Sequence, residues 1–377
     1  MPSYSGVWTL QAQMQAVAAG TWTGLPQLFA WGLGTSGQLG LGAAVSQSSP
    51  VQVGALTNWS QLASGNTHSL AVKNDGTMWS WGSNANGRLG LNDIVDRSSP
   101  VQIGALTTWY QVAGATNFSL AIKTDGTLWS WGRNDSGQLG INNVVDCSSP
   151  VQIGALTAWS QIAAGSGHSL AIKTDGTMWS WGTNGQGRLG LNDTADRSSP
   201  VQIGALTTWS QIAAGSAFSV AIKTDGTLWS WGYNSQGSLG IGSTVYRSSP
   251  VQVGALTTWY EIAAGGAFNL AIKTDGTLWS WGQGTSGQLG LGAAVTQSSP
   301  VQVGALTTWY EVAGGNNTSL AIKTDGTLWS WGYNTRGNLG LNDTANRSSP
   351  VQVGALTSWK SLSKTSQSIS SLAIKTT

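Results

Sequence analysis

The chain has 377 residues, of which only 8% are charged, and its formal net charge is +2. An ordinary soluble protein carries about 25% charged residues, so most of this surface must be uncharged. The small net charge gives no electrostatic basis for nucleic-acid binding, and no apolar run approaches the ~20 residues of a membrane-spanning helix. We therefore expect neither nucleic-acid binding nor membrane insertion.

Residues 1–27 differ in kind from the rest of the chain. They have neither the basic region nor the continuous apolar region of a classical signal peptide. Glutamines alternate with small or apolar residues, so helix and strand both remain open here. The segment is uncharged and contains Trp8 and Trp22. We expect either an extension that packs on the rim of the following domain, or a docking segment that contacts another chain through these two indoles.

From residue 28 onward the chain is built from repeats. The pair Trp-Gly recurs seven times at a spacing of 50 residues, at 31, 81, 131, 181, 231, 281 and 331. No segment has the 3.6-residue period of a helix, whereas short alternating runs bounded by turn residues indicate strands. One unit predicts strands at 209–213, 219–223, 227–231 and 250–253. Asp225-Gly226 supplies the positive φ of a tight hairpin between the second and third strands.

Four-stranded units without helices predict an all-β fold, a seven-bladed β-propeller of four-stranded antiparallel blades. Trp229 and Trp231 share one face of their strand, where packing between neighbouring blades would bury them. A solenoid is the competing architecture. Each end of the repeat array holds the half blade that the other lacks. We therefore expect residues 28–377 to form one propeller, closed by pairing of N- and C-terminal strands in a mixed blade from 28–53 and 359–375.

Residues 163–190 read Ala-Ala-Gly-x-x-His-Ser-Leu-Ala-Ile-Lys-x-Asp-Gly-Thr-x-Trp-Ser-Trp-Gly-x-Asn-x-x-Gly-x-Leu-Gly, which resembles the regulator-of-chromosome-condensation repeat. The resemblance covers about residues 28–375 and implies the propeller fold. It leaves the function open, because members of this family include nucleotide-exchange factors for a small GTPase, secreted bacterial β-lactamase inhibitors and modules of signalling proteins. The exchange factors carry an inserted β-wedge and a basic tail. Every internal blade here keeps the same length and no basic tail exists, which argues against exchange activity.

A second resemblance concerns bacteriophages. Residues 5–22 resemble the openings of bacteriophage structural and tail-appendage proteins, especially marine ones. The linker Ser-Ser-Pro-Val-Gln-Ile-Gly-Ala-Leu-Thr-Thr-Trp at 98–109 is also similar to repeats that such phages encode. This resemblance implies a virion or tail-appendage protein.

Comparison of the seven repeats with one another separates two fixed connections from two variable ones. The Lys-x-Asp-Gly-Thr turn after the second strand and the Gly-Ala-Leu-Thr linker before the first strand hardly change. The connections between the first and second strands and between the third and fourth strands vary strongly. Because antiparallel strands alternate in direction, both variable connections should emerge on one face. We interpret that face as a binding surface on a fixed scaffold; tolerance of change in long Gly/Asn loops is the alternative.

Five candidate ligand-binding residues follow the Trp-Gly pair on this face: Arg133, Tyr233, Gln283, Tyr333 and Arg336. Tyrosine and arginine are favoured at binding hot spots. Three phenylalanines (Phe118, Phe218 and Phe268) are expected to fill the packing between blades. His68 and His168 occupy the same place in the repeat, where the resemblance to the regulator-of-chromosome-condensation repeat implies a structural hydrogen-bonding group.

The sequence shows no catalytic constellation. Cys147 stands where four other repeats carry arginine, and no motif links it to either histidine, so we interpret it as drift of the repeat. Asn-Asp-x-x-Asp at 92–96 and 192–196 suits Asx turns as well as it suits calcium, which needs six to eight oxygen ligands. We expect no enzyme activity, no cofactor and no metal.

Two function classes follow. The first is a phage virion or tail-appendage protein, which docks to other virion proteins through residues 1–27 and recognises a host-surface protein or glycan through its variable loops. The second is an extracellular or surface protein-binding module of a bacterium, of the inhibitor or adhesin type. A guanine-nucleotide exchange factor is a weaker third possibility.

Overall fold

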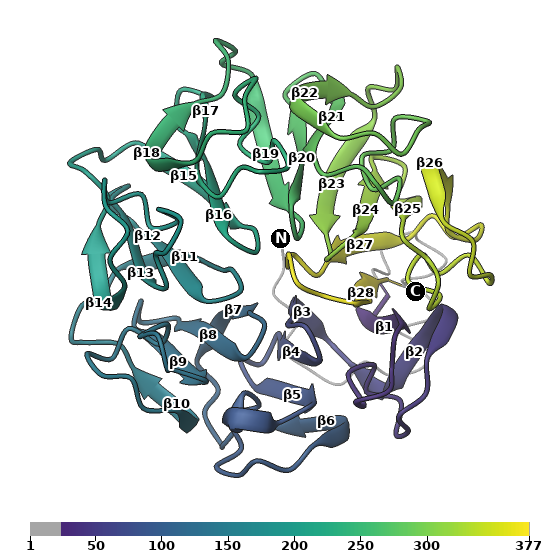
Figure 1. Cartoon of the computed structure of the whole chain (residues 1–377). Helices are drawn as coiled ribbons and strands as arrows, with labels where there is room; N and C mark the ends of the chain where they lie inside the picture. The colour runs from purple at the N-terminus through teal and green to yellow at the C-terminus, as the bar shows by residue number, and fades with distance from the viewer. Residues whose placement is uncertain (1–23, 377) are drawn as a thin grey trace, which may run out of the picture.

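The computed structural model of the chain describes residues 24–376. Seven four-stranded antiparallel sheets stand around a central axis (Figure 1), so the predicted seven-bladed propeller is confirmed. Trp8 and Trp22, and with them residues 1–23 of the docking segment, lie outside the described residues, whereas its last residue, Gln27, pairs with Thr57 and Lys375 in the closing blade. The only helical turn in the described part of the chain is η1 (Ala85–Gly87), and no helix there could span a membrane.

The strands fall into four classes by their position in the blade. The first strands line the central axis and are β3 (Trp59–Ser64), β7 (Trp109–Gly114), β11 (Trp159–Ala164), β15 (Trp209–Ala214), β19 (Trp259–Ala264), β23 (Trp309–Gly314) and β27 (Trp359–Leu362). The second strands are β4 (His68–Lys73), β8 (Phe118–Lys123), β12 (His168–Lys173), β16 (Phe218–Lys223), β20 (Phe268–Lys273), β24 (Thr318–Lys323) and β28 (Ser370–Lys375).

The third and fourth strands complete each blade toward the rim. The third strands are β1 (Gln27–Gly32), β5 (Met78–Gly82), β9 (Leu128–Gly132), β13 (Met178–Gly182), β17 (Leu228–Gly232), β21 (Leu278–Gly282) and β25 (Leu328–Gly332). The fourth strands are β2 (Gln47–Thr57), β6 (Arg97–Gln102), β10 (Cys147–Gln152), β14 (Arg197–Gln202), β18 (Arg247–Gln252), β22 (Gln297–Gln302) and β26 (Arg347–Gln352). We number the blades 1 to 6 from β3–β6 to β23–β26, and call the seventh the closing blade.

The closing blade has the strand order β2-β1-β28-β27, which joins the two ends of the chain. Leu28 pairs with Ile374 and Trp31 pairs with Ser371 in an antiparallel ladder. The expected ring closure is therefore confirmed, and the solenoid alternative is wrong. Closure gives β1 and β28 a partner on both sides, so neither of them is left as an unpaired edge.

The outermost strand departs from the sequence prediction. In blade 4 it begins at Arg247, three residues before the expected start at Pro250. Arg247 pairs with Gly232, and the ladder is then irregular until Val251 pairs with Ser230. The residues between them continue the strand through a bulge, which the pattern of apolar residues does not reveal. A proline is tolerated there because this strand is the edge of its sheet.

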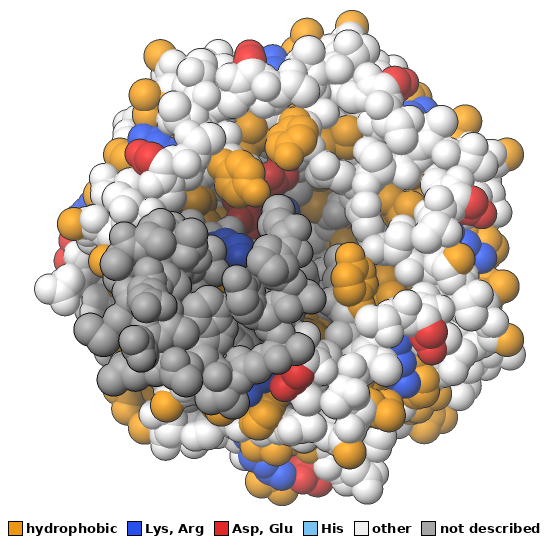
Figure 2. All heavy atoms as spheres, turned by 180° about the vertical axis from the view of Figure 1, so that it is seen from behind, with side chains coloured by type: hydrophobic (Ala, Val, Ile, Leu, Met, Phe, Trp, Pro, Cys, Tyr) orange, Lys and Arg blue, Asp and Glu red, His pale blue; other side chains and the backbone are white. Residues whose placement is uncertain are grey.

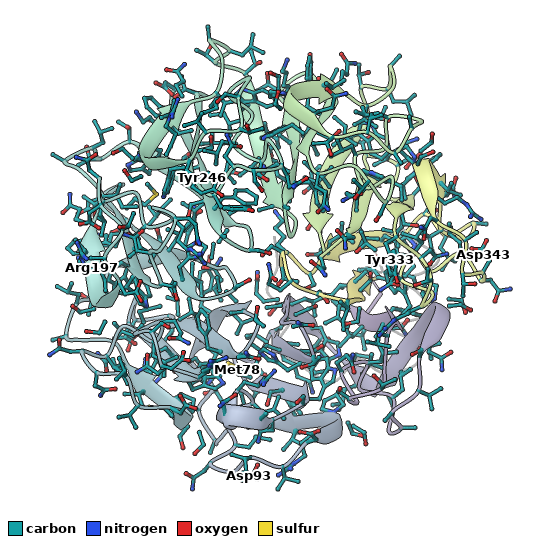
Figure 3. The ribbon with its side chains drawn as sticks, in the orientation of Figure 1. Met78, Asp93, Arg197, Tyr246, Tyr333 and Asp343 are labelled. Carbon is teal, nitrogen blue, oxygen red and sulfur yellow. The ribbon has the colours of Figure 1, made fainter. Side chains whose placement is uncertain are left out.

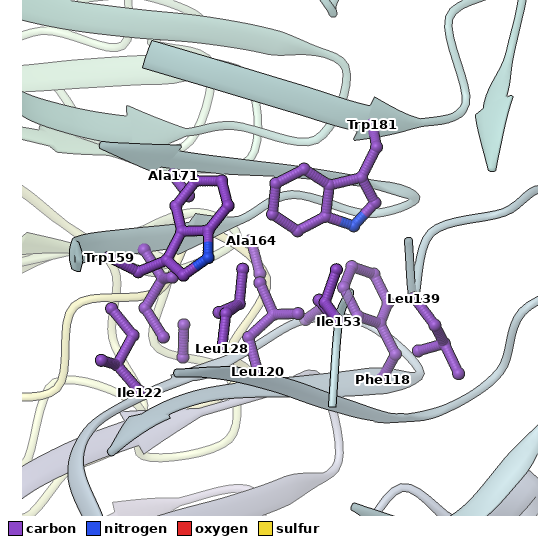
Figure 4. Packing of buried hydrophobic residues seen from close by; sticks show 13 residues of the cluster. Phe118, Leu120, Ile122, Leu128, Leu139, Ile153, Trp159, Ala164, Ala171 and Trp181 are labelled. Carbon is purple, nitrogen blue, oxygen red and sulfur yellow. The ribbon is translucent and has the colours of Figure 1, made fainter. Parts of the chain in front are cut away.

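The hydrophobic core lies between blades. Phe118, Leu120 and Leu128 of blade 2 pack against Trp159 and Trp181 of blade 3 (Figure 4). The expectation that both indoles of the third strand are buried is correct for Trp231, which is fully buried, and only partly correct for Trp229, which is half-buried. Because each cluster draws on two blades, the ring stabilises itself by the same interface repeated around the axis.

The hairpin between the second and third strands is held by its side chains. In blade 4, the Asp225 carboxylate accepts hydrogen bonds from the Thr227 amide (2.9 Å) and hydroxyl (2.7 Å). Gly226 has φ +75°, and a Cβ at this position would lie 2.2 Å from the Thr257 carbonyl oxygen. The Lys223 ammonium lies 3.7 Å from the centroid of the Trp229 ring. These contacts explain why the turn repeats with so little change.

Candidate functional site

The two variable connections of each blade emerge together. We call the connection between the first and second strands the inner loop, and that between the third and fourth strands the outer loop. The first residue of an outer loop donates its amide to the inner loop of the same blade, as Tyr233 does to Ala217 (2.9 Å) and Tyr333 to Asn317 (2.9 Å). The inner and outer loops therefore form one face of the disc, here called the variable face. The opposite side, with the Lys-x-Asp-Gly-Thr turns, is the hairpin face.

Backbone hydrogen bonds join the loops of neighbouring blades. The Ser216 amide binds the Gly266 carbonyl (3.0 Å) in the inner ring. In the outer ring, the Asn92 amide binds the Ser148 carbonyl (2.8 Å) of the next blade. Asn92 has φ +62°, and the equivalent places in other blades are held by asparagine or glycine. The variable face is thus a continuous surface whose backbone is fixed while its side chains differ.

A strap closes the centre of this face. The inner loop of the closing blade runs from 363 to 369 and bends toward the axis, whereas the other inner loops have three residues (Figure 1). Thr365 donates its hydroxyl to the Gly114 carbonyl (3.3 Å) in blade 2, and Gln367 donates its side-chain amide to the Ser216 hydroxyl (2.8 Å) in blade 4. The repeat pattern gave no sign of this path, because the strap departs from the repeat.

Two of the five candidate residues meet in one pocket. Tyr333 and Arg336 of blade 6 line a cavity of about 330 Å³, together with Asn316, Asn317 and the strap residues Ser368 and Ile369. Arg336 is exposed and Tyr333 is half-buried. The cavity places an aromatic ring, a guanidinium and amide groups side by side, which suits a ligand with hydrogen-bonding groups. Sequence reasoning missed the strap side of this pocket.

The other three candidates lie on the variable face but do not line this pocket. The Arg133 guanidinium pairs with Asp135, with 2.9 Å from its Nε to the carboxylate. The Tyr233 ring packs against that of Tyr246, with centroids 4.8 Å apart. Gln283 donates its side-chain amide to the Thr285 hydroxyl (3.3 Å). Tyr246 and Tyr333 belong to separate blades (Figure 3), so the candidates form separate spots around the ring.

The outer loops also expose apolar side chains at their tips. Between 54% and 69% of the side-chain surface is accessible in a group of aliphatic residues: Val45, Ile94, Val95, Val144, Val145 and Val245. These positions differ from blade to blade. Exposed apolar groups of this kind mark interaction surfaces when they lie close together.

The acidic motifs of the outer loops serve the loops themselves. In blade 1, Asp93 pairs with Arg97 (2.6 Å) and accepts a hydrogen bond from the Asn84 side chain (2.8 Å), while Asp96 accepts the Asn84 amide (2.7 Å). Figure 3 shows Asp93, Arg197 and Asp343 at the rim. The described residues contain no group of three or more His, Cys, Asp or Glu side chains that could hold a metal. The Asp93 carboxylate also accepts the Val95 amide two residues further on (3.0 Å), which is the bond of the Asx turn.

The two histidines are internal to the core. His68 and His168 are fully buried, and each lies 3.0 Å through its Nε2 from a serine hydroxyl of the next blade, Ser119 and Ser219. Burial, and to a smaller extent the nearby Arg88, lower the pKa of His68 to about 3. Phe118, Phe218 and Phe268 are buried at the same place in their blades, in the packing between blades that the sequence predicts.

Cys147 lies in the fourth strand of blade 2 and is half-buried. Burial, together with the neighbouring Asp146, raises the pKa of its thiol. The thiol form is therefore favoured over the reactive thiolate.

Comparisons with known proteins agree with this architecture. The fold superposes on the structure of Kap60 bound to yeast RCC1 (Prp20) with a TM-score of 0.82 and 22% identity, covering 93% of this chain and 89% of that chain. Human WBSCR16 gives a TM-score of 0.82 and 22% identity, covering 93% of this chain and 98% of that chain. Prp20p from Saccharomyces cerevisiae, studied for its binding to Gsp1p and histones, gives a TM-score of 0.81 and 23% identity, covering 97% of this chain and 94% of that chain.

At this identity the structural likeness shows the fold alone. No curated protein sequence matches the chain significantly. The family model described as RCC1-like domain matches residues 27–371, which is nearly the whole propeller. The chain therefore belongs to the RCC1-like domain family.

Proposed function

We propose that this chain is a non-catalytic binding propeller, which recognises its ligand through the variable face. One observation carries the proposal: differences among the blades concentrate in the inner and outer loops, whereas the backbone hydrogen bonds that hold those loops recur from blade to blade. A fixed frame with changing side chains is the arrangement expected of a recognition surface. The pocket at Tyr333 and Arg336 and the exposed aliphatic tips of the outer loops support it.

The finer proposal is that the chain is a virion or tail-appendage protein. Its support is the resemblance of residues 5–22 and of the Ser-Ser-Pro linker to phage-encoded sequences. In this proposal residues 1–27 dock to other virion proteins, and the variable face meets a protein or glycan of the host surface. Neighbouring tail or baseplate genes would support it, whereas genes of an export system would favour a bacterial surface or secreted module.

Exchange of guanine nucleotides is the disfavoured alternative. Among the described residues, blades 1 to 6 have the same four strands with connections of matching length, and none carries an inserted wedge. The solved structures whose proteins bind Kap60, or Gsp1p and histones, share the fold at 22–23% identity, which does not extend their partners to this chain.

Replacement of Tyr233 and Tyr333 together by alanine tests the binding proposal. A hot-spot truncation costs about 2 kcal/mol or more, so we expect adsorption of the labelled chain to host cells to weaken by about thirtyfold or more. Flow cytometry with increasing protein concentration measures the apparent affinity. Unfolding should change little, because both rings are partly exposed.

The matched control is Thr227→Ala with Thr327→Ala on the hairpin face. Both hydroxyls hydrogen-bond to the aspartate of their own turn, at 2.7 Å and 2.6 Å, so this variant should lose stability and keep its adsorption. Unchanged adsorption of the tyrosine variant would show that the variability of these loops reflects tolerance rather than recognition.

A further inference from the structure

The central channel forms a second cavity, distinct from the variable face. It has a volume of about 520 Å³ and is lined by the first strands of all seven blades and by the strap. The strap crosses the channel at the variable face, so that among residues 24–376 the cavity opens toward the hairpin face. Figure 2 shows that hollow from behind, with acidic and basic side chains inside it.

One ring of side chains surrounds this cavity. The third residue of each first strand is Gln61, Gln111, Gln161, Gln211, Glu261, Glu311 and Ser361, in order of the blades. Gln211 donates its side-chain amide to the Tyr260 carbonyl (2.6 Å) of the next blade. Glu261 and Glu311 instead accept the backbone amides of Val312 (3.2 Å) and Leu362 (3.0 Å). Either residue type therefore links neighbouring blades, and the fold does not require the two negative charges.

The charges in the cavity are not balanced. Glu261 forms an ion pair with Lys364 of the strap (3.0 Å), whereas Glu311 has no ion pair in the described part of the chain. The side chain of Glu311 is only 8% exposed. Burial raises the pKa of Glu311 to about 7, although the nearby Lys364 acts in the opposite direction. Burying an unpaired carboxylate is costly, so a cation at this place would stabilise the site.

Two further features of the cavity favour a ligand that carries a hydrogen-bond donor and a positive charge. On the opposite wall, the buried Oε1 of Gln111 has no hydrogen-bond partner among the described residues. The ring of Tyr260 lies in the lining and is half exposed, so its face is available to a cation. The adjacent Glu261–Lys364 pair shows that this cavity accommodates an alkylammonium group against a carboxylate at the same position of a neighbouring blade.

We propose that the central cavity binds a primary ammonium group, which forms an ion pair with Glu311. Its source is a free alkylamine or a lysine side chain of a partner. Glu311 passes to its ionised form when the cation arrives, so binding releases a proton near neutral pH. The cavity opens on the hairpin face, and the proposal therefore stands independently of the function proposed for the variable face.

Isothermal titration of the full chain with n-butylammonium chloride at pH 8, with 1-butanol as the neutral probe, tests the proposal. We expect n-butylammonium to bind and 1-butanol not to bind. Glu311→Gln should weaken the binding at least tenfold, and it places at 311 the residue that blades 1 to 4 already carry. Lys364→Met should tighten the binding, because it leaves the Glu261 carboxylate without its ammonium. Titration near pH 7 in buffers of different ionisation enthalpy should reveal the released proton.

Titration with a Gly-Lys-Gly peptide, blocked at both ends, distinguishes a free alkylamine from a lysine side chain of a partner. Binding of the peptide at least tenfold tighter than n-butylammonium supports a partner's lysine, and equal or weaker peptide binding supports a free amine. The proposal is overturned if neither probe binds, if 1-butanol binds as well as n-butylammonium, or if Glu311→Gln leaves the affinity unchanged. Adsorption through the variable face should be the same in the Glu311→Gln variant.

Discussion

The two faces of the propeller are made from the same repeats but differ in the bonds that hold their connections. On the hairpin face, the turn depends on its side chains, and the bond from the threonine hydroxyl to the aspartate recurs in blades 1 to 6 at 2.6–2.7 Å. On the variable face, recurring bonds between backbone atoms join the loops of neighbouring blades, and within an outer loop a recurring asparagine such as Asn84 accepts the Leu89 amide through its side chain. Because the backbone amide that opens an outer loop makes the same bond whatever its side chain is, residues as different as Arg133, Thr183 and Tyr233 can stand at that position.

Replacing one glycine on each face by alanine should give the largest difference in stability between the two faces. Gly226→Ala on the hairpin face forces a side chain onto φ +75° and against the Thr257 carbonyl, and we expect a loss of about 3 kcal/mol in the free energy of unfolding. Gly185→Ala in the outer loop of blade 3 has no atom within 4 Å of the new Cβ and should change stability by less than about 0.5 kcal/mol. Urea unfolding measures both, and equal losses would contradict the comparison.

Glu311 in the central cavity, which opens on the hairpin face, should make stability depend on pH. The folded protein keeps Glu311 protonated up to about pH 7, whereas in the unfolded chain this carboxyl ionises near its ordinary pKa. The folded state therefore binds more protons between these values, and this group's contribution falls as the pH rises, by up to about 3 kcal/mol. Glu311→Gln should be more stable than the wild type at pH 8 and should have a smaller loss between pH 5 and pH 8. Chemical unfolding at pH 5 and pH 8 measures the free energy of unfolding of both proteins. The same decrease between these pH values in the wild type and in Glu311→Gln would contradict the prediction.

The smallest expected effect concerns the lysines above the paired indoles of the hairpin face. Lys223→Met keeps the aliphatic stem but removes the charge 3.7 Å from the Trp229 centroid, so we expect a loss of about 0.5–1 kcal/mol. Lys360→Met, at an exposed lysine without an ion pair in the described residues, is the control and should be neutral. Thermal unfolding of the two variants compares them directly.

The sequence predicts the fold well because each local signal for a strand or a turn recurs from repeat to repeat. Trp-Gly, Asp-Gly and the alternating strands recur, and the two half blades at the ends imply closure. The start of the fourth strand could not be predicted, because its bulge is set by the pairing of Arg247 with Gly232 rather than by a pattern of apolar residues.

The candidate site is harder to predict because its parts come from different blades. Tyr333 and Arg336 were found as residue types, but the cavity beside them depends on the path of the strap, which no repeat describes. The ring around the channel did carry a signal. Comparison of the third residue of each first strand shows Gln replaced by Glu261 and Glu311, and the meaning of that change appears only when the strap brings Lys364 beside them.

The strap also bears on how many blades this protein can have. Every interface between internal blades is alike, so gain or loss of one 50-residue unit would leave both half blades of the seam complementary. The strap spans the ring, since it leaves the closing blade and donates hydrogen bonds to Gly114 in blade 2 and Ser216 in blade 4. The length of the strap is therefore matched to a ring of seven blades. An eighth repeat would widen the ring, and residues 363–369 would have to lengthen to keep both hydrogen bonds.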